Sequence, residues 1–178
     1  MKSRKIQTLP IWAFSLLLFF ITDSHTYAQT AGTLKWKFDV LSNDVSSPAI
    51  GGDGNLYFTA KSTLYSVKPS GALRWEFTVT SSLRECSIGK NGTIFVGSQN
   101  GLLYAINPDG TKKWELQLTA YPGYLSIGED GTIYVSSAEY NYNGPKNKLL
   151  AVNKDGTLKW EYKMPGGVYS KPAIGKDG

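Results

Sequence analysis

The sequence predicts an all-β protein built as a β-propeller, and three observations lead to this expectation. Short motifs recur along the chain after about residue 30. Each period holds four runs rich in Ile, Val, Tyr, Phe and Trp, separated by turns that contain Gly. No stretch in this part of the chain keeps the i, i+3, i+4 spacing of an amphipathic helix. Four strands in about 40 residues, repeated, are typical of propeller blades.

The segment 1–28 has the layout of a secretory signal peptide. Basic residues within 2–5 precede the apolar run 11–21, and polar residues follow. That run is much shorter than the roughly 20 residues that a membrane-spanning helix needs. Small residues lie before Gln29, so we expect cleavage after Ala28 and export to the periplasm or the extracellular space. A retained membrane anchor is the alternative.

The composition of the remaining chain restricts its chemistry. The one His of the sequence, His25, would be removed with the signal, and Cys86 is the one Cys. These counts exclude an intrachain disulfide, a Cys-based zinc site and serine–histidine chemistry. The mature chain would hold 16 basic and 13 acidic residues, a net charge of +3. This charge is too small to indicate a nucleic-acid partner, and no transmembrane span is expected after cleavage.

Three motifs recur in phase over the mature chain. Gly-Thr-Leu-Lys-Trp and its variants end at Trp36, Trp75, Trp114 and Trp160, at intervals of 39, 39 and 46 residues. Ile-Gly-x-Asp/Asn-Gly ends at Gly54, Gly92, Gly131 and Gly178. A Leu-Tyr-Ser-Val type begins at Leu64, Leu103 and Leu149. We therefore expect complete blades at about 46–79, 84–118 and 122–163, an outer strand at 33–40 and the start of a further blade at 169–178.

Residue types predict the radial order of the strands within a blade. Pro48 and Pro172 fall in the first strand of their units, and proline is confined to sheet edges because it cannot donate to the ladder. The first strand should therefore line the central channel. The last strand should be outermost, with a large ring that packs between neighbouring blades. The residues expected to dock blades in this way are Trp36, Trp75, Trp114 and Trp160.

The repeat resembles a known family. The block Ile-Gly-Glu-Asp-Gly-Thr-Ile-Tyr-Val at 127–135, the block Leu-Tyr-Ala-Ile-Asn-Pro-Asp-Gly-Thr at 103–111 and the following Lys-Trp-Glu at 113–115 are similar to the PQQ-like (pyrroloquinoline quinone) β-propeller repeat. The similarity covers about residues 32–178. It implies a ring of seven or eight blades, so three complete blades indicate a fragment of such a ring. A natural short form that closes by oligomerisation is the alternative.

The resemblance implies two kinds of function. The family includes quinoprotein alcohol dehydrogenases and the periplasmic scaffold of the outer-membrane β-barrel assembly machinery. The dehydrogenases use adjacent cysteines, calcium ligands and a catalytic Asp, whereas this chain has Cys86 alone and compact units. We expect an exported, non-catalytic binding or scaffold module without a cofactor. A PQQ-dependent dehydrogenase, whose quinone and calcium ligands would lie in missing blades, and a carbohydrate-binding propeller are the alternatives.

Variable loops indicate where a protein or polysaccharide partner would bind. In a four-stranded meander, the short Gly-x-Asp-Gly and Asn-Pro-Asp-Gly turns fall on one face, and the loops of variable length fall on the other. An insertion within 137–146 belongs to the variable face. The candidate binding residues are Arg84, Tyr121, Tyr124, Tyr140, Tyr142 and Tyr169. The alternative is that these tyrosines only decorate surface loops.

Two further features have simpler interpretations than catalysis. Asp residues precede Gly in the recurrent turns, and calcium loops also use Asp. Each turn offers one or two carboxylates, so turn geometry explains the Asp-Gly and Asn-Gly pairs better than calcium does. Cys86 takes the place that Pro48 and Pro172 hold in other units, and we interpret it as a small residue at the channel edge.

Overall fold

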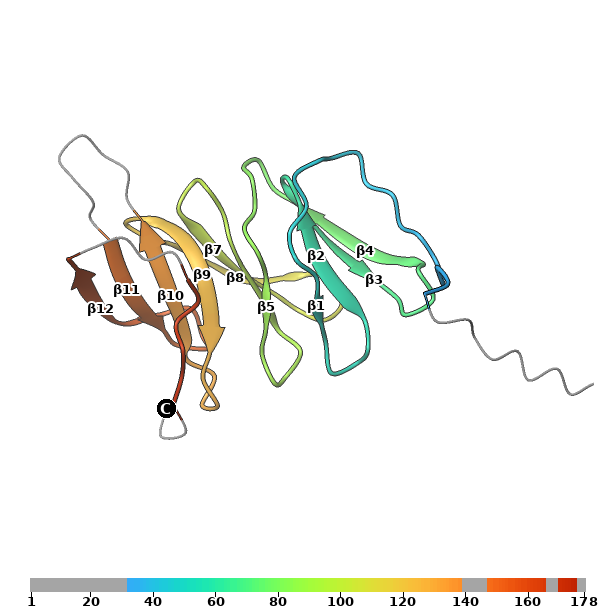
Figure 1. Cartoon of the computed structure of the whole chain (residues 1–178). Helices are drawn as coiled ribbons and strands as arrows, with labels where there is room; N and C mark the ends of the chain where they lie inside the picture. The colour runs from blue at the N-terminus through green and yellow to red at the C-terminus, as the bar shows by residue number, and fades with distance from the viewer. Residues whose placement is uncertain (1–31, 139–146, 166–169, 176–178) are drawn as a thin grey trace, which may run out of the picture. The chain divides into compact units, whose positions relative to one another are not determined.

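The computed structural model describes residues 32–138, 147–165 and 170–175, which contain three four-stranded antiparallel sheets and no helix (Figure 1). The chain divides into two units, Met1–Lys35 and Trp36–Gly178, and all three sheets belong to the second. The first sheet consists of β1 (Ala49–Ile50), β2 (Leu56–Ala60), β3 (Thr63–Val67) and β4 (Leu73–Thr78). The second consists of β5 (Ser87–Ile88), β6 (Ile94–Gly97), β7 (Leu102–Ile106) and β8 (Lys112–Gln117). The third consists of β9 (Tyr121–Ile127), β10 (Ile133–Ala138), β11 (Asn147–Val152) and β12 (Leu158–Met164).

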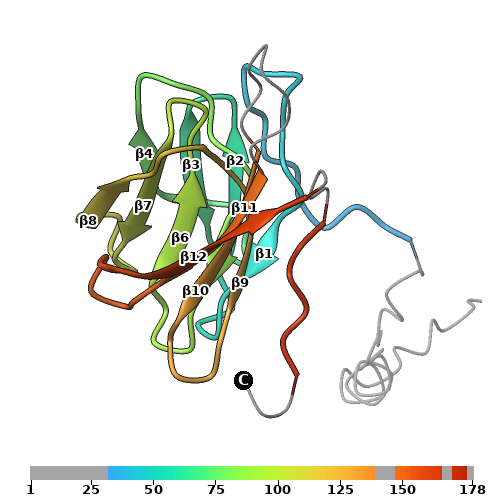
Figure 2. The ribbon, with the colours of Figure 1, turned by 90° about the vertical axis from the view of Figure 1, so that its left-hand side faces the viewer.

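Each sheet is a simple meander, in which every strand pairs with the one that follows it in the chain. The first strand and the last strand are therefore the two edges of every sheet. The predicted all-β class and the four-stranded antiparallel blades are confirmed, and the three sheets are three blades of a propeller. Figure 2 shows the sheets one behind another.

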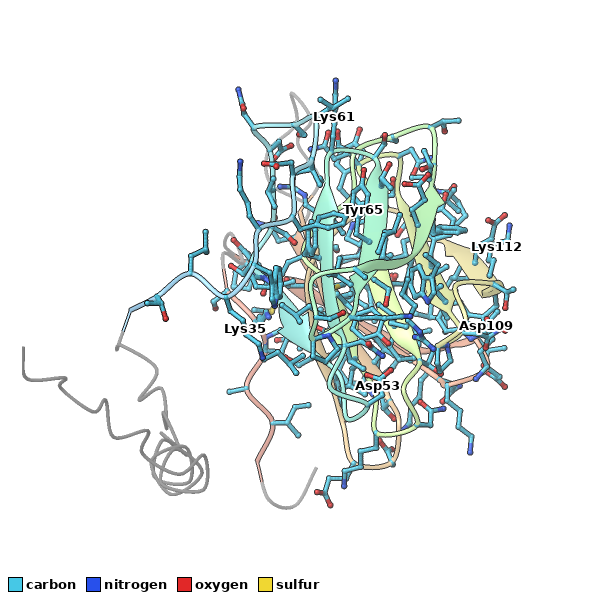
Figure 3. The ribbon with its side chains drawn as sticks, turned by 90° about the vertical axis from the view of Figure 1, so that its right-hand side faces the viewer. Lys35, Asp53, Lys61, Tyr65, Asp109 and Lys112 are labelled. Atoms are coloured by element: carbon cyan, nitrogen blue, oxygen red, sulfur yellow. The ribbon has the colours of Figure 1, made fainter. Side chains whose placement is uncertain are left out.

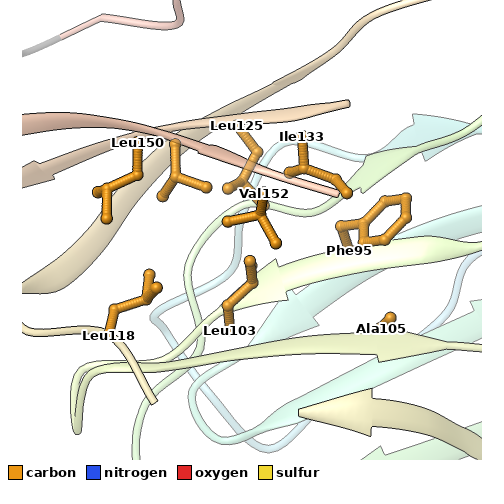
Figure 4. Packing of buried hydrophobic residues seen from close by; sticks show 9 residues of the cluster. Phe95, Leu103, Ala105, Leu118, Leu125, Ile133, Leu150 and Val152 are labelled. Atoms are coloured by element: carbon orange, nitrogen blue, oxygen red, sulfur yellow. The ribbon is translucent and has the colours of Figure 1, made fainter. Parts of the chain in front are cut away.

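The hydrophobic core consists of two clusters, one in each space between consecutive sheets. Side chains alternate across a strand, so the middle sheet supplies both clusters. Ile94, Val96 and Ile106 face the first sheet, where they pack with Tyr57 and Leu64. The other cluster joins the middle and third sheets and contains Phe95, Leu103, Ala105, Leu118, Leu125, Ile133, Val135, Leu150 and Val152 (Figure 4). Burial on both faces explains why all four residues of β6 are buried.

The first strands of the sheets lie beside one another, since β1 contacts β5 and β5 contacts β9. They border an open hollow of about 450 Å³, together with Lys171, Pro172 and Ile174. Ser87 Oγ donates to the carbonyl oxygen of Leu125 at 3.0 Å, and so links the first strands of two blades. A side chain as short as that of Ser87 allows β5 and β9 to approach each other closely at this point.

A recurrent hydrogen bond joins the Trp of one repeat to the next repeat. The indole Nε1 atoms of Trp36, Trp75 and Trp114 donate to the carbonyl oxygens of Pro69, Pro108 and Lys154 at 2.9, 2.9 and 3.0 Å. Each acceptor lies in the β3–β4 type of turn, where the following Gly faces the indole ring. A Cβ added at Gly110 would lie 2.7 Å from Trp75 Cδ2, so the turn needs Gly to let the ring approach.

Trp160, the last of the series, is placed differently. Its side chain is 40% exposed, and it packs against Tyr134 of its own sheet, with ring centroids 6.0 Å apart. Leu158 and Tyr162 of the same strand, β12, are also exposed.

Two expected segments do not form strands. Residues 33–40 and the described part of 169–178, residues 170–175, contain no strand. A strand requires a hydrogen-bonded neighbour, and the described residues provide no sheet partner for either segment. Both segments nevertheless contact the sheet that is next to them in the repeat. Phe38 contacts the rings of Phe58 and Tyr65 edge to face, and Ser126 Oγ donates to the carbonyl oxygen of Pro172 at 2.5 Å.

Candidate functional site

The two ends of the sheets differ in character, and the difference follows from the meander. The regular end carries the turns β1–β2, β3–β4 and their counterparts in the other sheets. The variable end carries the connections β2–β3, β4–β5, β6–β7 and β8–β9. Figure 3 shows Lys61, from the β2–β3 connection, and Asp53, from the β1–β2 turn, at opposite ends of the first sheet. Candidate residues of a binding face are found at the variable end.

Arg84 lies in the connection from the first sheet to the second, and backbone bonds fix its position. Its amide donates to the carbonyl oxygen of Gly97 at 2.8 Å, and its own carbonyl oxygen accepts from Thr59 Oγ1 at 3.1 Å. Gly97 also faces Pro122 of β9, since a Cβ on Gly97 would lie 2.7 Å from Pro122 Cβ. The backbone of Gly97 therefore brings the segment of Arg84 close to the beginning of β9.

Tyr121 and Tyr124 belong to β9, and their side chains are 46% and 39% exposed. Pro122 and Leu125, which follow them directly, are buried. The Tyr124 amide donates to Ser136 Oγ at 2.9 Å, and Ser136 Oγ donates back to the Tyr124 carbonyl oxygen at 3.2 Å. The strand is thus held on its buried side while it presents two aromatic rings to the surroundings.

A cavity of about 240 Å³ lies at the same end, between the second and third blades. Its lining comes from the β6–β7 loop, from Gln117 and the β8–β9 connection, and from Tyr121. Lys148 borders this region, because its Nζ donates to Thr119 Oγ1 at 2.9 Å and pairs with Glu161 at 3.0 Å. Arg84, Tyr121 and Tyr124 are therefore the predicted candidate residues that the structure places at the variable end. Tyr140, Tyr142 and Tyr169 lie outside the described residues.

The carboxylates of the regular end are used by their own turns. Asp109, Asp130 and Asp155 accept the amides of the residues two positions later at 3.0, 2.9 and 3.0 Å. Hydrogen bonds from Thr111, Thr132 and Thr157 to these carboxylates lower the pKa of all three Asp side chains. Asp177 lies outside the described residues. These bonds stabilise each turn, as expected for the Asp-Gly pairs.

The basic residue before each Trp was not recognised from the sequence as significant. Arg74 Nη1 lies 3.7 Å from Asp53 Oδ2 and donates to the carbonyl oxygen of Pro108 at 2.6 Å. Lys159 Nζ lies 3.6 Å from Asp130 Oδ2 in the third blade. An available signal was the repeat itself, in which a basic residue always precedes Trp and Asp or Asn always fills the turn.

Cys86 is 1% exposed, and its Sγ lies 3.5 Å from the carbonyl oxygen of Tyr57, to which it donates. Burial raises the pKa of the Cys86 thiol to about 12, so the thiol is protonated at neutral pH. The nucleophile in thiol chemistry is the thiolate, which this environment suppresses.

The described residues do not fit a quinone cofactor with its calcium ion. They contain no group of three or more His, Cys, Asp or Glu side chains that could hold a metal ion. Cys86 has no second Cys beside it in the sequence. We therefore derive no reaction through such a cofactor. The described part of the chain also contains no helix that is both long and apolar enough to cross a membrane.

Comparisons with known proteins agree with this fold. The family described as outer membrane protein assembly factor BamB matches residues 25–174. No curated protein matches the chain. A crystal structure of a protein of unknown function from Bacteroides caccae is similar, with a TM-score of 0.61 and 14% identity over 80% of this chain and 54% of that one.

Two further solved structures are similar. BamB from Moraxella catarrhalis has a TM-score of 0.50 and 15% identity, over 74% of this chain and 52% of that one. The WD40 domain of Pan2 from Neurospora crassa has a TM-score of 0.50 and 15% identity, over 66% of this chain and 35% of that one. At such identities the likeness concerns the fold. This chain spans about half the length of the first two structures.

Proposed function

The chain belongs to the family of the outer membrane protein assembly factor BamB, and from this membership we propose that it is an exported, non-catalytic scaffold that binds a protein partner. The basic and apolar N-terminal segment, with small residues before Gln29, supports export. The description of the matching family, an outer membrane protein assembly factor, supports a role in outer-membrane protein assembly, for which the periplasm is the proposed compartment. We assign no cofactor to the protein.

The observation that carries the proposal is the pair of exposed aromatic rings on β9. Tyr121 and Tyr124 project from a strand whose adjacent residues Pro122 and Leu125 are buried. Tyrosine gives a large contact area and a hydroxyl group at a small cost in side-chain entropy. Aromatic residues and Arg are enriched at protein interfaces, so Arg84 at the same end supports the assignment. Loops and strand ends held by a rigid framework are common positions for binding residues.

Site-specific photo-crosslinking in cells tests the proposal. A photoreactive amino acid at position 121 or 124 is expected to capture one discrete protein that takes part in outer-membrane protein assembly. The same amino acid at position 111, in the β7–β8 turn of the regular end, serves as the control. Identical products from both ends, or none from position 121 or 124, would contradict the proposed binding face.

A double variant gives an independent measurement. Tyr121→Ala together with Tyr124→Ala is expected to weaken binding of the captured partner at least tenfold, since aromatic residues at interface centres contribute about 2 kcal/mol or more. Both rings are already partly exposed, so thermal unfolding of the double variant should stay close to that of the wild type. Full retention of binding would refute the role of these tyrosines.

Export and the absence of a cofactor are tested separately. A reporter enzyme that folds only outside the cytoplasm, fused after residue 165, should be active, and it should lose activity when residues 1–28 are deleted. Titration of the purified protein with pyrroloquinoline quinone and calcium should leave the quinone absorption unchanged. A saturable spectral change would instead favour a quinoprotein.

A further inference from the structure

The three sheets repeat a pair of charged groups at the regular end, and the middle sheet breaks the pattern. The basic residues before Trp are Arg74, Lys113 and Lys159, and the matching turn residues are Asp53, Asn91 and Asp130. The first and third sheets keep a close pair, at 3.7 Å and 3.6 Å. The middle sheet has a neutral amide where the others have a carboxylate.

In the first blade, the basic side chain is Arg74, and its guanidinium makes hydrogen bonds to two groups. Arg74 Nη1 donates to the carbonyl oxygen of Pro108 in the second blade at 2.6 Å and to the Tyr57 hydroxyl at 3.4 Å. The Tyr57 hydroxyl in turn donates to Asp53 Oδ2 at 3.0 Å. The space between the first two blades at this end is therefore crossed by a hydrogen-bonded guanidinium.

The middle blade lacks the two side-chain acceptors that engage Arg74. Phe95 stands where the first blade has Tyr57, and Asn91 stands where it has Asp53. Asn91 Oδ1 accepts the amide of Thr93 at 3.1 Å, which uses it within its own turn. Within the described residues, the ammonium of Lys113 has neither an ion pair nor a side-chain acceptor.

A cleft lies beside Lys113, between the second and third blades. Its volume is about 180 Å³, and it combines the apolar side chains of Phe95 and Ile127 with three lysines. Lys90 is balanced by Glu129 at 3.0 Å. The remaining acidic lining residue, Asp130, is paired with Lys159 from outside the lining. Lys113 and Lys154 are therefore the lysines of the cleft that form no ion pair with a carboxylate of the described residues, although Lys154 also interacts electrostatically with Asp155 of its own turn.

We propose that this cleft binds a carboxylate, with its negative charge between Lys113 and Lys154 and its alkyl stem against Phe95 and Ile127. An ammonium–carboxylate contact in a partly enclosed, partly apolar space is a charge-assisted hydrogen bond, stronger than a neutral one. The size of the cleft and its two lysines without an ion pair fit a short acid. The acid is either a free dicarboxylate or the side chain of Glu or Asp in a partner protein.

The backbone of the cleft argues against a phosphate. Phosphate sites in proteins commonly use several free backbone amides. The amides of the three lining glycines, Gly89, Gly128 and Gly131, are committed to carbonyl oxygens of their own turns, at 2.9, 2.8 and 3.0 Å. The ammonium groups of Lys113 and Lys154 are the charged donors without an ion pair, and the two of them match the two oxygens of one carboxylate.

Titration of the protein with sodium glutarate at constant ionic strength, followed by amide resonances in NMR spectra, tests the proposal. Saturable shifts are expected in residues 89–95 and 127–131. Lys113→Gln should weaken binding about fivefold or more, because it removes a charge-assisted contact. Lys68→Gln, which removes the same charge from an exposed position in the first blade, should leave binding unchanged.

A second variant separates charge from folding. Asn91→Asp restores in the middle blade the carboxylate that the other blades have, so it should neutralise Lys113 from within and weaken glutarate binding to a similar extent. This variant should be at least as stable as the wild type, since Asp53 and Asp130 accept the same turn amide. Unchanged binding in both Lys113→Gln and Asn91→Asp would overturn the assignment.

Two peptides identify the source of the carboxylate. Tighter binding of acetyl-Ala-Glu-Ala-amide than of glutarate, with no binding of the Gln analogue, would assign the cleft to an acidic side chain of a partner. Tighter binding of glutarate would assign it to a free acid. If neither glutarate nor the Glu peptide produces saturable shifts in the wild type, the cleft is not a carboxylate site.

Discussion

The indole Nε1 of Trp75 donates a hydrogen bond of 2.9 Å to the carbonyl oxygen of Pro108, which lies 33 residues later in the neighbouring sheet. The same contact joins Trp36 to Pro69 and Trp114 to Lys154. One contact per repeat therefore connects each unit to the next. In repeat proteins, stability is approximately a sum of intrinsic and nearest-neighbour terms, so this contact is a natural place to perturb the interface.

Gly110→Ala is expected to lower the free energy of unfolding by about 3 kcal/mol. The residue has a φ of +91°, which costs an L side chain about 1–2 kcal/mol, and its new Cβ would lie 2.7 Å from Trp75 Cδ2. Urea unfolding followed by tryptophan fluorescence measures the loss. Gly54→Ala is the control, because its φ is +76° but the nearest atom, Pro69 Cγ, would be 3.7 Å away. Equal losses in the two variants would show that the contact with Trp75 contributes nothing.

Trp75→Phe is expected to cost about 1 kcal/mol, the net value of one hydrogen bond. The loss should stay near this value because the Pro108 carbonyl oxygen still accepts from Arg74 at 2.6 Å. Trp160→Phe should change stability by less than about 0.5 kcal/mol, since Trp160 is 40% exposed and its indole makes no hydrogen bond to the described residues. Chemical denaturation of both variants provides the comparison, and a larger loss at position 160 would contradict it.

The repeat period made most of the fold predictable. Strands separated by Gly turns, in phase over three units, fix which residues pair, and the alternation within β6 follows from its position between two sheets. The interval between Trp75 and Trp114 also indicated that these rings occupy equivalent places. The turn that receives each ring was not foreseen, because it belongs to the next unit and is brought close only by the stacking of the sheets.

The other differences between the predicted and the observed structure also come from contacts with neighbours that lie elsewhere in the chain. Residues 33–40 carry a strand-like pattern, but strand formation depends on a hydrogen-bonded neighbour that sequence pattern does not reveal. The surplus charge of Lys113 was visible as Asn91 and Phe95 in place of Asp and Tyr. Its significance requires the position of Lys154, which comes from another blade. Local patterns therefore predicted the elements, whereas contacts between blades required the structure.

The Cys86 thiol is expected to react with a disulfide reagent at pH 8 at least 100-fold more slowly in the folded protein than in urea. Burial raises its pKa to about 12, and its exposed fraction is 1%, so both the thiolate population and the access of reagent are reduced. The absorbance of the released thiol measures the rate. Rapid labelling of the folded protein, at conditions where its fluorescence is native, would contradict the burial of Cys86.

The stability of the protein is expected to fall as the pH decreases through the acid range. Hydrogen bonds from threonine side chains and backbone amides lower the pKa values of Asp109, Asp130 and Asp155 below 3.8 in the folded state. A group with a lowered folded pKa stabilises the protein above its unfolded pKa and loses this contribution as the pH falls through the folded value. Urea unfolding at pH 6 should therefore need more denaturant than unfolding at pH 3.

Replacement of all three aspartates by Asn separates this effect from general acid unfolding. Asn91 already fills the turn that corresponds to the turn of Asp130, and its Oδ1 accepts the Thr93 amide at 3.1 Å. Asp109 and Asp155 accept the amide two positions later in the same way, so we expect an amide side chain to maintain all three turns. The variant should fold, and its unfolding midpoint should depend less on pH between 6 and 3 than that of the wild type. An identical pH dependence would mean that these three carboxylates do not control acid stability, since nothing else that titrates in this range distinguishes the two proteins.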